Sequence, residues 1–210
     1  MIGLIAALSY FLIGGGGDGG KSVALQSAQA TLANMITAAR VRAMASGQRA
    51  RVLVHVDPNS RTTPARYLRY LVVQVQVGAG WQSFAEAYLP DGIYVVPGKF
   101  ATIPAGLFSA TGLWTKADGT ALRSTVLQSV RILPETINDT AAEQWVSFEL
   151  SATGGTAQSG DFILATGVAR PPGSFVTGDA PIELQFPDNV RGVTLSSYGV
   201  PALVNTRLSF

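Results

Sequence analysis

The hydrophobic period of this chain changes once, at Gly47. Between residues 23 and 46, apolar side chains recur at steps of three and four, which predicts an amphipathic helix. From Arg51 to Val56 the period shortens to two, which predicts a strand that ends in a turn at residues 57–59. No second long amphipathic helix follows. We therefore predict an α+β fold in which one N-terminal helix packs on an antiparallel, β-rich globular head.

The rest of the chain after this turn contains further strand-like segments separated by Gly-, Pro- and Asp-rich turns. We predict strands at 67–77, 93–96, 125–133, 145–152, 162–166, 182–186 and 193–196. No internal repeat is apparent, so one β-rich head over residues 48–210 is the expected organisation.

The predicted helix has identifiable ends. Ser22 is placed to cap its N-terminus, and Gly47 is a natural terminator. Arg40 and Arg42 fall in its last turns, where cations suit the helix dipole. The apolar stripe consists of Leu25, Ala28, Leu32, Met35, Ile36, Ala39 and Ala43. We expect the helix to pack on its own sheet and on a neighbouring molecule, with different faces used for the two.

Residues 1–13 are apolar on every side, and residues 14–20 are almost entirely glycine. Thirteen residues of helix rise about 20 Å, whereas the hydrocarbon core of a bilayer is about 30 Å thick. The segment is thus too short for a complete membrane span, and it lacks the basic start of a secretory signal. We predict an N-terminal part over residues 1–47, comprising the apolar segment 1–13, a Gly-rich break at 14–20 and an amphipathic helix at 22–46.

The glycine-rich segment also matches a phosphate-binding loop, G-x-x-x-x-G-K-S, from Gly15 to Ser22. In that alternative the backbone N–H groups of Gly15 and Gly20 hold phosphates, Lys21 reaches the terminal phosphate and Ser22 binds Mg²⁺. Asp57, after the first strand, then corresponds to the second metal-binding acid. Such a fold needs a parallel sheet with crossover helices, and the sequence after Gly47 shows no such helices. Nucleotide binding is therefore the second hypothesis.

Composition gives little support to catalysis. The chain has no Cys and one His, which excludes thiol nucleophiles, thiolate zinc sites and multi-histidine metal sites. The acidic residues are scattered without the spacing of an acid–base pair. His55 alternates with Val54 and Val56 and is expected at the surface or rim of a strand. We predict no enzyme activity, no cofactor and no metal.

Charge is unevenly distributed along the chain. Residues 1–85 carry eight basic and two acidic side chains, a balance of +6, and residues 86–210 carry seven basic and eleven acidic, a balance of −4. The candidate surface for an anionic partner consists of Arg40, Arg42, Arg49, Arg51, Arg66 and Arg69. Tyr67, Tyr70 and Trp81 lie near these arginines in the sequence, as in single-strand DNA-binding surfaces. Subunit contacts and helix-end electrostatics are favoured over DNA as their role.

The sequence IGLIAAL at 2–8 and the helix end AARVRAMASGQ at 38–48 resemble type IV pilins and pseudopilins of the GspH/FimT kind. Arg40, Arg42, Ala43 and Gly47, leading into the strand at 51–56, carry the resemblance over the first 60 residues or so. The family's leader and its acidic residue near the mature N-terminus are not present. The chain therefore resembles an N-terminally incomplete member or an outlier of the family, and the sequence leaves open whether the true N-terminus lies upstream of Met1.

The resemblance implies a structural subunit of a type IV pilus-like filament or a type II secretion pseudopilus. It implies residence in the inner membrane and periplasm, then in a cell-surface filament, with methylation of the subunit. The partners would be other copies of the chain or other pilin-like subunits, contacted through the N-terminal helix. The residues predicted to carry this assembly are Ile2, Leu4, Ile5, Leu8, Leu12, Leu25, Leu32 and Ile36.

Overall fold

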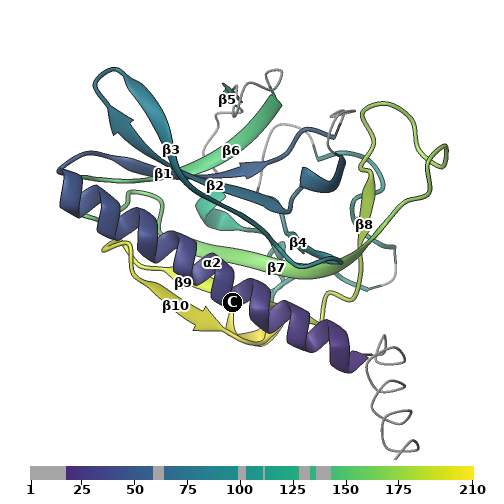
Figure 1. The fold of residues 1–210 in the computed structure, drawn as a ribbon. Helices are drawn as coiled ribbons and strands as arrows, with labels where there is room; N and C mark the ends of the chain where they lie inside the picture. Colours follow the sequence, from purple (N-terminus) through teal and green to yellow (C-terminus); the bar gives the residue numbers. More distant parts are fainter. Residues whose placement is uncertain (1–17, 59–63, 99–102, 111, 128–132, 136–142) are drawn as a thin grey trace, which may run out of the picture.

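The computed structural model describes residues 18–58, 64–98, 103–110, 112–127, 133–135 and 143–210. One long helix, α2, lies along the length of a head made of two antiparallel sheets (Figure 1). The predicted α+β fold, an N-terminal helix packed on a β-rich head, is confirmed. The predictions for residues 1–17, including Ile2, Leu4, Ile5, Leu8, Leu12 and Gly15, fall outside the described residues.

Helix α2 spans Asp18–Ser46 and begins earlier than the sequence suggested. Ser22 lies inside the helix, so its predicted role as N-cap is wrong, and residues 18–20 of the predicted Gly-rich break are helical. Intrinsic propensity costs about 1 kcal/mol per glycine and is readily outweighed by tertiary contacts. The C-terminal end is as predicted: Gly47 has a φ of +64°. The N–H of Gln48 donates to the carbonyl of Ala43, which completes a Schellman cap.

The first sheet contains five strands in the order β3-β2-β1-β6-β5. Their bounds are β1 Ala50–His55, β2 Tyr70–Val77, β3 Gly80–Tyr88, β5 Leu133–Glu135 and β6 Glu143–Leu150. All neighbours are antiparallel, with a register shift between β2 and β3. The predicted strand at 125–133 is wrong over its first residues, because Thr125–Leu127 forms a short 3-10 helix that buries Val126 and Leu127.

The second sheet has the order β10-β9-β7-β4, and β8 pairs with the C-terminal residues of β7, Gly167 to Ala169. Its strands are β4 Ile93–Val95, β7 Gly160–Ala169, β8 Ile182–Leu184, β9 Val190–Leu195 and β10 Pro201–Val204. Two further 3-10 helices span Pro64–Arg66 and Arg207–Ser209. The ladders that join the named strands of this sheet are antiparallel as well.

The main core lies where α2 meets both sheets. Leu25, Leu32 and Ile36 of α2 are fully buried in it. Phe148 of β6 and Phe162 of β7 meet edge to face across the two sheets, with ring centroids 6.1 Å apart. A second, smaller cluster lies on the other face of the first sheet and consists of Leu53, Tyr70, Val72 and Trp145. Both faces of that sheet therefore bury apolar side chains.

Candidate functional site

One face of α2 is buried against the sheets and the opposite face is exposed. The apolar stripe is used by the core of the chain itself, so Leu25, Leu32 and Ile36 are not available to a neighbouring molecule in this structure. The opposite face is open and carries three large apolar side chains, Val23, Val41 and Met44, which are 69%, 53% and 41% exposed. A subunit contact through α2 would therefore have to use the open face rather than the stripe.

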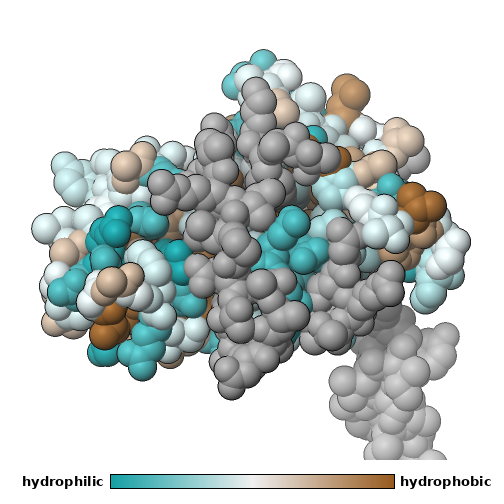
Figure 2. Space-filling model, turned by 90° about the horizontal axis from the view of Figure 1, so that it is seen from above, coloured by the Kyte–Doolittle hydropathy of each residue, from teal (hydrophilic) through white to brown (hydrophobic). Residues whose placement is uncertain are grey.

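The surface of the head, seen from above in Figure 2, mixes hydrophilic and hydrophobic residues in small groups. Over the coloured part of that face, no single broad apolar patch is visible. Among the described residues, no helix combines the length and the apolar character needed to cross a bilayer. Along the open face of α2, the apolar residues are separated by the exposed polar residues Gln26, Asn34 and Thr37.

The phosphate-loop alternative lacks the sheet it requires. Lys21 and Ser22 lie within α2, and the ammonium of Lys21 sits 5.2 Å from the ring centroid of Phe186. The strand that precedes Asp57, β1, pairs antiparallel with both of its neighbours, and so do the other named strands of the described residues. A parallel β–loop–helix unit that would aim Gly20, Lys21 and Ser22 at a nucleotide is therefore not formed by this part of the chain.

The six arginines of the predicted anionic-partner surface separate into two groups. Four of them, Arg40, Arg42, Arg49 and Arg51, lie where α2 ends and β1 begins. Arg66 and Arg69 lie at the other end of the first sheet, beside the start of β2. The sequence placed all six in one series because they follow one another along the chain. The fold does not bring them into one patch, and contact with DNA stays the disfavoured alternative.

Most of these arginines are engaged within the molecule. Arg40 donates from Nε to the carbonyl of Tyr198 at 3.0 Å. Arg51 is buried and donates from Nε to Oε1 of Gln74 at 2.9 Å. Arg69 lies 2.5 Å from the carboxylate of Asp91, measured from its Nη2 atom to Oδ1. Such internal partners lower the capacity of these guanidinium groups to hold an outside anion.

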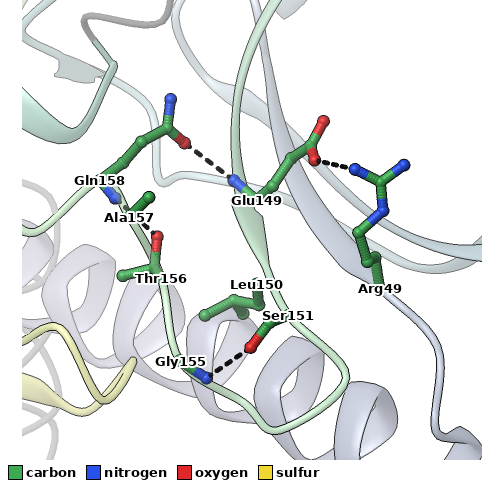
Figure 3. A pocket seen from close by; sticks show the side chains of 8 residues that line it. All are labelled: Arg49, Glu149, Leu150, Ser151, Gly155, Thr156, Ala157 and Gln158. Carbon is green, nitrogen blue, oxygen red and sulfur yellow. Dashed lines mark hydrogen bonds and ion pairs between the residues drawn. The ribbon is translucent and has the colours of Figure 1, made fainter.

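A hollow of about 820 Å³ opens beside Arg49. Figure 3 shows its wall: Nη1 of Arg49 lies 3.0 Å from Oε2 of Glu149, and the backbone N–H of Glu149 donates to Gln158. The N–H of Gly155 donates to Oγ of Ser151. These polar groups already satisfy one another. The hollow is lined by Arg49, by the end of β6 and by the loop that follows it.

His55 does not lie at the surface, and that prediction is wrong. Its side chain is fully buried on the face of β1 opposite the main core, edge to face with Trp145 at a centroid distance of 5.0 Å. Its Nε2 atom is 3.3 Å from Oε2 of Glu143. Burial lowers the pKa of His55 below its ordinary value of 6.5, and the charge of Glu143 opposes that shift only in part. A neutral, packed imidazole has a structural role.

Within the described ranges, no group of three or more His, Cys, Asp or Glu side chains could hold a metal ion. Sequence reasoning also missed Phe84, which stands out of β3 and packs against Arg42. A strand pattern gave no signal for it, because its position depends on an irregular register between β2 and β3.

Comparison with known proteins returns structures but no family. No family model matches the sequence, and no curated protein matches it. Among solved structures, two of the minor pseudopilin EpsH from the type II secretion system of Vibrio cholerae are similar to this chain. Each is 19% identical and covers 87% of this chain and 96% of the other, with TM-scores of 0.40 and 0.39.

Proposed function

We propose that this chain is a pilin-like structural subunit that is held at the inner membrane and assembles into a pilus-like filament or a secretion pseudopilus. Its partners are further copies of the chain or other pilin-like subunits. Residues 1–13 form the membrane and filament-core part, and residues 48–210 form the head. One observation carries the proposal: α2 is fixed in the head along one face and open along the other.

The order of elements supports this role. The N-terminal segment that precedes α2 is apolar on every side, which suits a helix that leaves lipid to pack among other helices. Because Leu25, Leu32 and Ile36 fix α2 to both sheets, a force on the helix passes directly to the head. Contacts between subunits then fall to the apolar N-terminal segment and to the open face of α2. The role requires no catalytic group.

The absence of cysteine from the sequence makes a clean cross-linking experiment feasible. The full chain with Val23→Cys and Val41→Cys carries two thiols on the open face of α2 and no others. In membranes from cells that produce it, a bismaleimide should give a ladder of dimers, trimers and larger species, because adjacent helices bring thiols of different subunits together. Gel electrophoresis of the treated membranes measures the ladder.

The matched control keeps one helix thiol and moves the other away from it. Val176, 71% exposed in the loop between β7 and β8, serves for this purpose in a Val41→Cys, Val176→Cys variant. We expect that variant to stop at dimers. The proposal fails if both variants give the same pattern, or if the Val23, Val41 variant stays monomeric while a maleimide dye labels its thiols.

A further inference from the structure

Three arginines of the head share one arrangement, in which a guanidinium lies over an aromatic ring and also contacts a carboxylate. Arg49 lies over Trp81 and pairs with Glu149. The other two sets are Arg66 with Tyr70 and Glu143, and Arg69 with Tyr94 and Asp91. Stacking uses the flat face of the guanidinium and leaves the N–H groups at its edge for the acid.

Arg42 and Phe84 repeat the first half of this arrangement. The guanidinium carbon of Arg42 is 5.0 Å from the ring centroid of Phe84. Arg42 is exposed, and Phe84 is 49% exposed. Among the described residues, no carboxylate lies within ion-pair distance of Arg42. The Arg42–Phe84 pair therefore presents a guanidinium edge to the outside without an acid of its own.

An irregularity in β3 creates this pair. Val73 faces Ala85 and Gln74 faces Ser83, so Phe84 has no residue opposite it on β2. Such a bulge redirects the side chain of the extra residue. Here it directs Phe84 toward α2, on an edge strand of the described sheet, where Arg42 stacks on it. The ring is thereby held at the boundary between the helix and the sheet.

The positive charge of the pair is that of Arg42 itself. Arg40, Arg49 and Arg51 lie at the same end of the first sheet, but Arg40 is bonded to Tyr198, and Arg49 and Arg51 lie over Trp81. An exposed guanidinium edge attracts an anionic group from another molecule. Because Arg42 covers the ring of Phe84, that ring is less suited to stacking on a nucleic-acid base than to fixing a guanidinium for a carboxylate.

We propose that the Arg42–Phe84 pair is a docking point for an Asp or Glu side chain of a neighbouring protein subunit. The carboxylate completes the same three-part arrangement that Arg49, Trp81 and Glu149 form within the chain. The inference rests on the proposed function for its partner, since it requires a second subunit beside the helix. It names the chemical groups of one contact between subunits, which the proposed function leaves undefined.

Carbodiimide coupling tests the contact directly. The Arg42→Lys variant of the full chain places a primary amine at this point, and a carbodiimide joins that amine to a touching carboxylate as an amide with loss of water. In membranes from the organism that encodes the chain, we expect an adduct between residue 42 and an Asp or Glu of another polypeptide. Mass spectrometry of the digested adduct identifies the acidic peptide. Production of the chain with and without an affinity tag in the same cells separates links between copies from links within one copy.

The matched control is Val77→Lys, which puts the same amine on an exposed residue at the end of β2, off the open face of α2. We expect at least a fivefold lower yield of adduct from it. Equal yields from the two variants would overturn the proposal, and so would an adduct of residue 42 with its own chain or with a lipid headgroup.

A second variant separates this contact from the general role. Phe84→Leu removes the stack while keeping an apolar side chain, and in the Arg42→Lys background it should reduce the adduct several-fold. If the thiol ladder from Val23 and Val41 forms but residue 42 gives no intermolecular adduct, the docking point is wrong and the subunit role stands. An intermolecular adduct of residue 42 without a thiol ladder would support the docking point and contradict assembly through the open face of α2.

Discussion

Gln29 of α2 donates a hydrogen bond from Nε2 to the carbonyl oxygen of Gly192 in β9, at a distance of 2.7 Å. The same amide nitrogen also lies 2.9 Å from the carbonyl oxygen of Val204 in β10. Gln29 is buried, and both carbonyls belong to a residue pair that faces across β9 and β10. One polar side chain therefore holds the helix to the edge of the second sheet.

Replacing Gln29 with Ala should destabilise the head by about 2–3 kcal/mol, because two buried carbonyl oxygens lose a donor. Gln26→Ala is the matched control, since Gln26 lies on the exposed side of the same helix and its loss should change stability by less than about 0.5 kcal/mol. Urea unfolding of both variants, followed by circular dichroism, measures the difference. Similar midpoints for the two variants would contradict this role of Gln29.

Gly192 is required for a different reason. A Cβ atom at this position would lie 2.1 Å from the carbonyl oxygen of Phe162, on the neighbouring strand β7. Gly192→Ala should therefore force β7 and β9 apart and cost about 1–3 kcal/mol. At Gly80, by contrast, a Cβ has its nearest contact at 3.9 Å, so Gly80→Ala is the control. Thermal unfolding should separate the two, and an unchanged melting temperature for Gly192→Ala would refute the packing argument.

The helix stripe was predictable because it depends on local spacing. Leu25, Leu32 and Ile36 recur at helical steps, and the structure buries all three. The start of the helix was not predictable from a capping residue, because the helix continues through Gly19 and Gly20 to Asp18, and Lys21, inside it, lies over Phe186 far along the chain. Intrinsic preference near a helix end is a weak determinant.

The candidate site was less predictable, because pairing across strands decides it. His55 alternates with valines, but a sequence cannot tell whether the second face of a sheet is covered, and here Trp145 and Tyr70 cover it. The series of arginines could be recognised in the sequence from its positive charge. The contact of Arg42 with Phe84 was not visible, because the bulge that directs Phe84 arises only when β2 and β3 pair.

Lys21 offers a test of the alternative function. The structure packs its ammonium on Phe186, an exposed cation–π contact worth about 0.5–1 kcal/mol. Lys21→Ala should lower the stability of the full chain by no more than that. Equilibrium dialysis with ATP and Mg²⁺ should detect no binding to either the wild type or the variant. Saturable ATP binding that Lys21→Ala abolishes would favour the phosphate-loop hypothesis over a structural subunit.

The stability of the head should depend on the protonation of His55, the single histidine of the chain. Burial lowers the pKa of His55 in the folded state below its ordinary value of 6.5, so the unfolded chain takes up a proton that the folded chain excludes as the pH falls through 6.5. The contribution of the neutral imidazole is complete above pH 6.5. It is lost progressively below that pH, down to the folded-state pKa.

The free energy of unfolding should therefore fall between pH 7 and pH 5 in the wild type. His55→Gln keeps a polar side chain that cannot take up a proton, and it should flatten that slope even if it lowers stability at every pH. Urea unfolding at closely spaced pH values measures both curves. If the two curves run parallel through this range, the pH dependence comes from carboxylates, and His55 is not the group that titrates.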